Sequence, residues 1–404
     1  MNTTTKNWAI ALLLLACLTN CSDDDVVAVP DGAGVSESSL TRAEQQMAEA
    51  YNSFALTLFQ TLRTESDLVV APLSTAFSLG MISGGAEGAT QSQICGVLGT
   101  AGGNTGAVNT FFRKILDGAT ATDSGSKLQV ANNIYVNKAY GLNSRFVEMA
   151  RDYYDAAPEA LDFSDGHSLT VINDWVYERT DGLVPEFLSA EELSPALPCC
   201  LLNALCFSGT WAEVFNSRLT SESAFAGGKE VLMMRQTNLY DYGEDDVAQY
   251  LRLPYADSTF CMTVYLPRAE VGVDRVVERI TERGWQPAAF LQRTVSVALP
   301  RFDVTSDIQL SSALSAMGMP LAFSPQADFS ALCSTPMYIS AMKQKARVIV
   351  SEDGTVAAAA TGTTAATSDN SSGIIKFRAD HPFCYTISEE RTGIILFVGQ
   401  FYGK

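Results

Sequence analysis

The chain has 404 residues, a formal net charge of −18 and 47% hydrophobic residues. This length and apolar content suffice for a full hydrophobic core without disulfide or metal support. The acidic excess argues against nucleic acid, heparin-type cofactors and anionic membrane surfaces as partners. No linker-like stretch or internal repeat divides the chain after about residue 40, so we expect one large domain over residues 40–404, and a monomer.

The first residues are typical of a targeting signal. Lys6 precedes an apolar run from Trp8 to Leu18, which is too short to span a bilayer and fits the hydrophobic region of a signal peptide. We therefore expect residues 1–20 to be a lipoprotein signal peptide and residues 21–39 to be an acidic, polar tether.

Two cysteines are candidates for lipid attachment. The run Leu18-Thr19-Asn20-Cys21 resembles a bacterial lipobox and is followed by a serine and three aspartates. Cys17 is the alternative, because the Leu-Leu-Ala before it fits the lipobox pattern better but leaves a shorter apolar run. These features predict a lipid-anchored protein of the bacterial outer membrane or cell surface, with a simple secreted form as the alternative.

The remaining seven cysteines are predicted to be buried thiols, because their number is odd, their surroundings are largely apolar and no two have CxxC spacing. They are Cys95, Cys199, Cys200, Cys206, Cys261, Cys333 and Cys384. His167 and His381 are the only histidines, and neither lies near paired cysteines, so we expect no metal and no cofactor. The scarcity of histidine also argues against an enzyme with a nucleophile and a base.

The chain then shows regular helix and strand patterns. A capping box followed by an i, i+3, i+4 apolar stripe predicts a long helix over residues 41–63. Residues 67–71 predict a short strand, and Pro72 begins another helix. Further along, residues 128–136 alternate as a buried strand and residues 146–154 carry a helical stripe.

An alanine- and threonine-rich stretch over residues 352–375 differs from an ordinary linker. It contains no proline and no aromatic residue, whereas flexible linkers are usually rich in Gly, Ser or Pro. A strand-like alternation ends just before it, and an apolar strand pattern resumes at Ile374. Alanine and threonine can lie extended in a sheet or stand free, so we expect a loop with two conformations. An exposed low-complexity connection is the alternative.

Several motifs together resemble those of the serpin family of serine protease inhibitors. In chain order they are Pro72-Leu73-Ser74, with Ala71 where a first serine is usual, Gly84–Thr90, Leu201–Trp211, the hinge Glu352–Thr361, Asp380–Phe383 and Gly393–Gly399. Their order matches that of the family over about residues 40–402. The resemblance implies an α+β fold with a large central mixed or antiparallel sheet, additional sheets, eight or nine helices and an exposed reactive loop.

The resemblance also implies an activity. In the family a protease attacks the exposed loop and forms an acyl-enzyme, and the cut loop then inserts into the main sheet and distorts the enzyme. The hinge that inserts first comprises Glu352, Gly354, Thr355, Val356, Ala357, Ala358, Ala359, Ala360 and Thr361. No charge or proline lies on the face that would be buried, which favours a suicide-type inhibitor that traps a serine protease covalently. The alternative is a non-inhibitory surface lipoprotein of serpin fold that is cleaved as a substrate or acts as a binding or scaffold protein.

A further implied feature is the group of residues that controls how the sheet opens. Ser74, Asn203 and Gln344 would form a hydrogen-bonded cluster, and Trp211 would lie beneath the hinge, in the region called the breach. Gln344 replaces the histidine that is usual at its position, and an amide donates and accepts hydrogen bonds much as a neutral imidazole does. We therefore predict that the cluster is kept, without pH sensitivity near neutrality.

Spacing places the attacked bond between Ser368 and Asp369. In the family the acyl-side residue lies fourteen residues after the hinge glycine, or fourteen before the proline of this ending, and both counts reach Ser368. A hinge one residue shorter would give Thr367–Ser368, and cleavage within residues 364–366 is a further alternative. Because these side chains are small, we expect an elastase- or subtilisin-like target rather than a trypsin- or chymotrypsin-like one.

Overall fold

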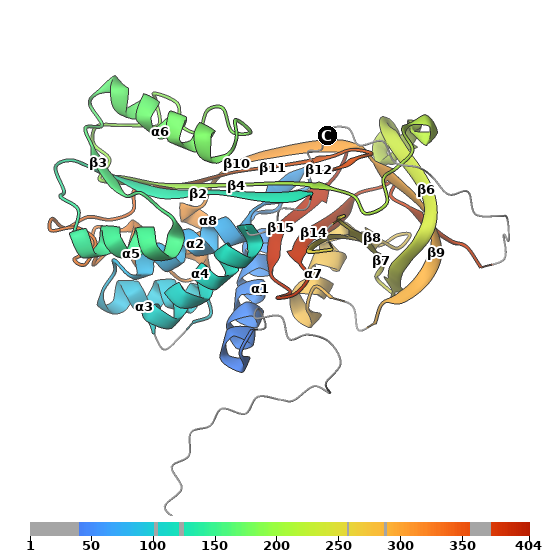
Figure 1. Ribbon diagram of the computed structural model, residues 1–404, viewed down its shortest axis with the longest axis horizontal. Coiled ribbons are helices and arrows are strands. Elements are labelled where there is room, and N and C mark those ends of the chain that lie inside the picture. Colours follow the sequence, from blue (N-terminus) through green and yellow to red (C-terminus); the bar gives the residue numbers. More distant parts are fainter. Residues whose placement is uncertain (1–39, 101–103, 121–124, 257, 287–288, 356–372) are drawn as a thin grey trace, which may run out of the picture. The chain divides into compact units, whose positions relative to one another are not determined.

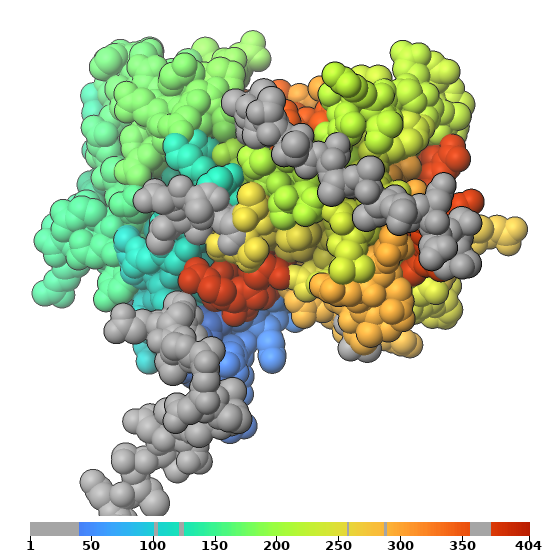
Figure 2. Space-filling model, turned by 45° about the vertical axis from the view of Figure 1, so that its right-hand side comes forward, coloured from blue at the N-terminus to red at the C-terminus, as the bar shows by residue number. Residues whose placement is uncertain are grey.

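Two β-sheets with helices packed against them are seen in the computed structural model, which describes residues 40–100, 104–120, 125–256, 258–286, 289–355 and 373–404 (Figure 1). These residues belong to one compact unit, Ser38–Lys404. In a space-filling view, the green residues around α6 and the yellow-green residues around β5 and β6 cover opposite sides of one face (Figure 2).

Eight α-helices lie in the described residues, and the first begins where the sequence predicts. They are α1 (Arg42–Leu62), α2 (Pro72–Ser83), α3 (Gly88–Val97), α4 (Thr105–Thr120), α5 (Ser144–Tyr154), α6 (Gly166–Arg179), α7 (Val273–Arg283) and α8 (Ser311–Met317). Both hydrogen bonds of the predicted capping box are present: the Thr41 hydroxyl accepts from the Glu44 N–H, and the Glu44 carboxylate accepts from the Thr41 N–H. None of these helices is long and apolar enough to cross a membrane.

The main sheet has six strands in the order β10-β11-β12-β4-β2-β3. Their bounds are β2 (Ser126–Asn137), β3 (Glu159–Leu161), β4 (Cys199–Thr210), β10 (Phe302–Gln309), β11 (Ala341–Val350) and β12 (Gly354–Thr355). Helix α6 covers one face, and α2 lies against the other (Figure 1). All twelve residues of α2 are buried, and the helix begins with Pro72 at its first position, as predicted.

The second sheet has nine strands. Eight follow the order β1-β15-β14-β8-β7-β6-β9-β13, and β5 pairs with β6. They are β1 (Leu68–Val70), β5 (Ser221–Phe225), β6 (Lys229–Glu244), β7 (Ala248–Pro254), β8 (Phe260–Pro267), β9 (Leu291–Pro300), β13 (Ile375–Arg378), β14 (Phe383–Glu389) and β15 (Ile395–Phe401). The sheet thus joins the start of the fold to its last strand, because β1 pairs with β15.

The core of the described residues has two parts. The larger cluster lies between the sheets and the helices α1 to α5, α7 and α8. The smaller one lies between α6 with the chain that follows it and the outer face of β2 and β4. All seven cysteines of the described residues are free and buried, which confirms the prediction of buried thiols.

Candidate functional site

The hinge joins the main sheet at one end of β4 and β11. Thr355 pairs with Val350 of β11 and with Gly209 of β4, antiparallel to both. Beyond this point β11 and β4 pair directly and in parallel, residues 341–347 with residues 200–206. We call this direct ladder the seam. A strand that continued β12 would have to part β11 from β4 along the seam.

Gly354 and Thr355 fit this position closely. Gly354 has a φ of 152°, and a Cβ on it would overlap the carbonyl oxygen of Gly209, so only glycine can occupy the position. The hydroxyl of Thr355, which is fully buried, shares a hydrogen bond of 2.6 Å with the hydroxyl of Tyr255. Burial raises the pKa of Tyr255 well above its ordinary value, so this hydroxyl stays protonated.

Trp211 holds the turn that leads into β12. Its indole N–H donates to the carbonyl of Ser351 at 2.9 Å, and its backbone N–H donates to the carbonyl of Asp353 at 2.9 Å. The indole also stacks on the ring of Tyr255, with centroids 4.6 Å apart. Because Trp211 directly follows β4, the turn that leads into β12 is fastened to the end of that strand.

Glu352 ties the hinge to residues next to the second sheet. Its Oε1 accepts a hydrogen bond of 2.7 Å from the hydroxyl of Thr220, and its Oε2 lies 3.4 Å from the guanidinium of Arg301. Its carbonyl accepts the N–H of Phe215 at 2.9 Å. Thr220 precedes β5 and Arg301 follows β9. The sequence analysis missed both residues, because no local pattern distinguishes them from other surface polar residues.

Gln344 closes the start of α2. Its Oε1 accepts the N–H of Ala71 at 3.0 Å, and its Nε2 donates to the Ala71 carbonyl at 2.8 Å and to the Thr75 hydroxyl at 2.7 Å. Ala71 precedes the helix and offers no side-chain cap of its own. The glutamine of β11 therefore satisfies the Ala71 N–H, which a buried helix start would otherwise leave unpaired, and shares the Ala71 carbonyl with the N–H of Thr75.

Ser74 and Asn203 lie nearby but have other partners. The Ser74 hydroxyl donates to the Oδ1 of Asn132 at 2.6 Å, and the Nδ2 of Asn203 donates to the carbonyl of Lys343 at 3.3 Å. Asn132, Asn203 and Gln344 stand opposite one another on β2, β4 and β11. The structure thus brings the three predicted residues together, although in the described chain no hydrogen bond joins any two of them. A polar residue in the apolar pattern of β2 was the signal that could have identified Asn132.

Several predicted site residues lie outside the described residues. They are Val356, Ala357, Ala358, Ala359, Ala360 and Thr361 of the hinge, Thr367, Ser368 and Asp369 of the attacked bond, and the lipidation candidates Cys17 and Cys21.

The family model of the serpins, described as serine protease inhibitors, matches residues 49–403. The chain belongs to the serpin family. This serpin is 31% identical to neuroserpin from Gallus gallus, over 84% of this chain and 86% of that protein. It is 30% identical to an uncharacterized serpin-like protein from Methanosarcina acetivorans, over 96% of this chain and 95% of that one.

The solved structure of Serpin48, a highly specific serpin of the insect Tenebrio molitor, is similar to this serpin with a TM-score of 0.81 and 27% identity. The match covers 90% of this chain and 99% of that structure. The predicted family and the α+β serpin fold are thus confirmed. Members of this family are for the most part protease inhibitors and not catalysts.

Proposed function

We propose that this serpin is a suicide-type inhibitor of serine proteases with elastase- or subtilisin-like specificity, and that it traps the acyl-enzyme by inserting its cleaved loop into the main sheet. The observation that carries this proposal is the position of β12. Gly354 and Thr355 already lie between β4 and β11, antiparallel to both strands. An inserted strand in this orientation would replace the parallel seam with two antiparallel ladders, which are slightly more stable per residue.

The free energy released by loop insertion can be compared with the free energy needed to distort a protease. Each added backbone hydrogen bond contributes about 0.5–1.5 kcal/mol net. A strand of about ten residues would therefore release on the order of 10 kcal/mol, which is comparable to the whole stability of a typical domain. That is enough to distort the active site of a protease that remains attached to the moving strand.

The protease itself supplies the chemistry of the covalent step. Its serine hydroxyl adds to the carbonyl carbon of Ser368, the peptide bond to Asp369 breaks, and the amine of Asp369 leaves with a proton, so Ser368 is held as an ester. The small side chains of Ala365, Ala366 and Thr367 before this bond suit a shallow specificity pocket, which does not reject small groups by volume.

The proposal is tested by mixing the protein with an elastase-type and a subtilisin-type protease. The products are separated on a denaturing gel, and the released peptide is analysed by mass spectrometry. We expect a band at the summed mass of the two proteins and a peptide that begins at Asp369. If every protease tried gives cleaved product without the summed band, the inhibitor proposal is wrong, and the protein is a substrate or scaffold of serpin fold.

We also propose that the protein acts as a monomer anchored in the bacterial outer membrane or at the cell surface, through a lipid on Cys21. The support is the lipobox-like run and the acidic residues that follow it. Labelling cells with a fatty-acid analogue should mark the wild type and the Cys17→Ala variant but not the Cys21→Ala variant. The reverse pattern would assign the lipid to Cys17, and absence of label in the wild type would favour a secreted protein.

A further inference from the structure

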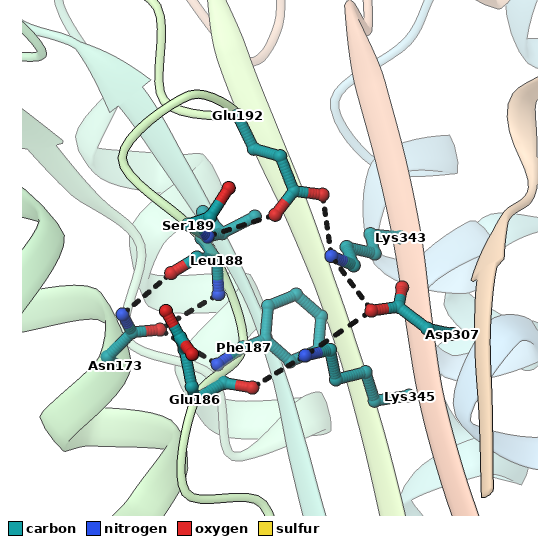
Figure 3. Close-up of polar contacts among 9 residues, drawn as sticks. All are labelled: Asn173, Glu186, Phe187, Leu188, Ser189, Glu192, Asp307, Lys343 and Lys345. Atoms are coloured by element: carbon teal, nitrogen blue, oxygen red, sulfur yellow. Dashed lines mark hydrogen bonds and ion pairs between the residues drawn. The ribbon is translucent and has the colours of Figure 1, made fainter.

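The chain that follows α6 crosses the outer face of the seam and is held there by two lysines of β11 (Figure 3). The ammonium of Lys343 lies 2.6 Å from the Oε1 of Glu192 and 3.1 Å from the Oδ2 of Asp307 on β10. The ammonium of Lys345 donates to the carbonyl of Glu186 at 2.6 Å and lies 3.3 Å from the same carboxylate of Asp307. We call residues 186–192 the crossing segment.

Lys343 is unusual because it is a buried lysine. Its side chain is only 5% exposed, whereas the side chains of Glu192 and Asp307 are 33% and 47% exposed. Its ammonium also lies 6.0 Å from the centre of the Phe187 ring. A buried ammonium is costly unless it is paired and hydrogen-bonded. Loss of these contacts should therefore cost more free energy at Lys343 than at its two partners, whose side chains reach solvent.

The crossing segment is fastened to the β2–β4 side of the seam. The Oδ1 of Asn173 on α6 accepts the N–H groups of Phe187 and Leu188, each at 2.9 Å, and its Nδ2 donates to the Leu188 carbonyl at 2.8 Å. Phe187 and Leu188 pack in the smaller core cluster with side chains of β2 and β4, among them Ala131 and Leu202. The segment is therefore part of the layer that covers β2 and β4.

Lys343, by contrast, belongs to β11, and β11 is paired along its length with β10. Its ion pair with Glu192 therefore joins the two halves of the main sheet across the seam, whereas its ion pair with Asp307 stays within one half. Inserting one strand separates the former neighbours by a further 4.7–4.9 Å or so. A contact of 2.6 Å cannot survive that separation unless the crossing segment leaves its place on β4.

We propose that Lys343 and Glu192 form a latch that holds β11 against β4 and sets how readily the seam opens. Its role in inhibition rests on the proposed function, because loop insertion would have to open the latch, but the latch itself is a property of the uncleaved protein. When Glu192 moves away, the buried ammonium loses one of its two carboxylates, which opposes opening at the level of Lys343 and its partner in the seam, Leu202.

The latch is tested by hydrogen–deuterium exchange of the uncleaved full chain, followed by mass spectrometry of peptides that cover residues 200–206 and 341–347. Lys343→Met removes the charge and keeps much of the volume, and Glu192→Gln keeps the shape of the acceptor. We expect the seam amides of both variants to exchange roughly tenfold faster than those of the wild type. The seam amides of the double variant should exchange no faster than those of Lys343→Met, because both changes remove the same contact.

The chain offers a matched control in Arg347. This residue lies on the same face of β11 and forms a bidentate ion pair with Asp303 of β10, at 2.7 and 2.9 Å, but it does not bridge the seam. Arg347→Met should leave seam exchange within twofold of the wild type, and peptides from β14 and β15 should be unchanged in all variants. Wild-type exchange in both latch variants, or an equal increase in Arg347→Met, would overturn the proposal.

The design also covers a variant that does not fold and a protein that traps no protease. If Lys343→Met does not fold, Glu192→Gln decides the question alone, since the Glu192 side chain is one-third exposed. The exchange measurement needs no protease, so a protein that traps no protease would disprove the proposed function and still test the latch. Covalent trapping together with unchanged seam exchange would disprove the latch alone.

Discussion

The replacement Thr355→Arg should convert the protein from an inhibitor into a substrate of its protease. Thr355 is fully buried between β4 and β11, with its hydroxyl bonded to Tyr255. An arginine there must bury an unpaired guanidinium or pull β12 out of the sheet. Leaving a buried charge uncompensated costs about 3–5 kcal/mol, and 1.36 kcal/mol in a barrier is tenfold in rate. At about 4 kcal/mol, insertion would slow roughly 1000-fold.

Thr355→Val is the matched control, because valine has nearly the same shape and no charge. It removes only the hydrogen bond to the Tyr255 hydroxyl, at a cost of about 1–3 kcal/mol. The assay mixes each variant with an elastase-type protease and compares the summed-mass band with the cleaved band on a denaturing gel. We expect cleaved product alone from Thr355→Arg and mostly covalent complex from Thr355→Val.

Two results would refute this reasoning. If Thr355→Arg forms as much covalent complex as the wild type, burial of position 355 does not control insertion. If Thr355→Val loses the complex as completely as Thr355→Arg, loss of the hydrogen bond to Tyr255, and not the buried charge, explains the failure to form the complex.

Three other replacements, at Trp211, Ser368 and Glu192, test the hinge, the attacked bond and the ion pair with Lys343. Trp211→Phe removes the indole hydrogen bond at the hinge and should lower the free energy of unfolding by about 1 kcal/mol, seen as a lower urea midpoint. Ser368→Arg should move the covalent band from elastase-type to trypsin-type proteases, and a band that stays with elastase would place the attacked bond elsewhere. Burial raises the pKa of Glu192, but hydrogen bonds, the one from Lys343 foremost, outweigh it and hold the pKa below its ordinary value. A lowered folded pKa adds stability that is present above the unfolded value and lost as the pH falls through the folded one. The difference in urea midpoint between wild type and Glu192→Gln should therefore disappear in acid, and a constant difference from pH 7 to pH 3 would contradict this.

Local patterns in the sequence predicted helix starts well where the hydrogen bonds involved join residues that are close in the chain. The capping box of α1 and the proline start of α2 involve neighbours in the chain, so their hydrogen bonds could be foreseen. The free, buried cysteines also follow from their odd number, their apolar neighbours and the absence of CxxC spacing. The family resemblance supplied the rest of the architecture, including the position of the hinge beside Trp211.

The polar contacts of the site were less predictable, because their partners are distant in the chain. Gln344 was expected beside Ser74 and Asn203, yet its amide bonds to the backbone of Ala71 and to Thr75. The alternation of β11 marks Lys343 as one of several polar positions, and nothing local shows that it alone is buried among the basic residues Lys343, Lys345 and Arg347. Only the fold brings Glu192 close enough to pair with it.

The stacking of Trp211 on Tyr255 gives this protein a built-in optical reporter. Indole emission responds to hydrogen bonding and to the polarity around the ring, and the indole N–H of Trp211 is bonded to the carbonyl of Ser351, directly before the hinge. The other tryptophans of the described residues are Trp175 on α6 and Trp285 after α7. With both of these and Trp8 replaced by phenylalanine, fluorescence recorded in a stopped-flow instrument would follow the hinge in real time without any added dye.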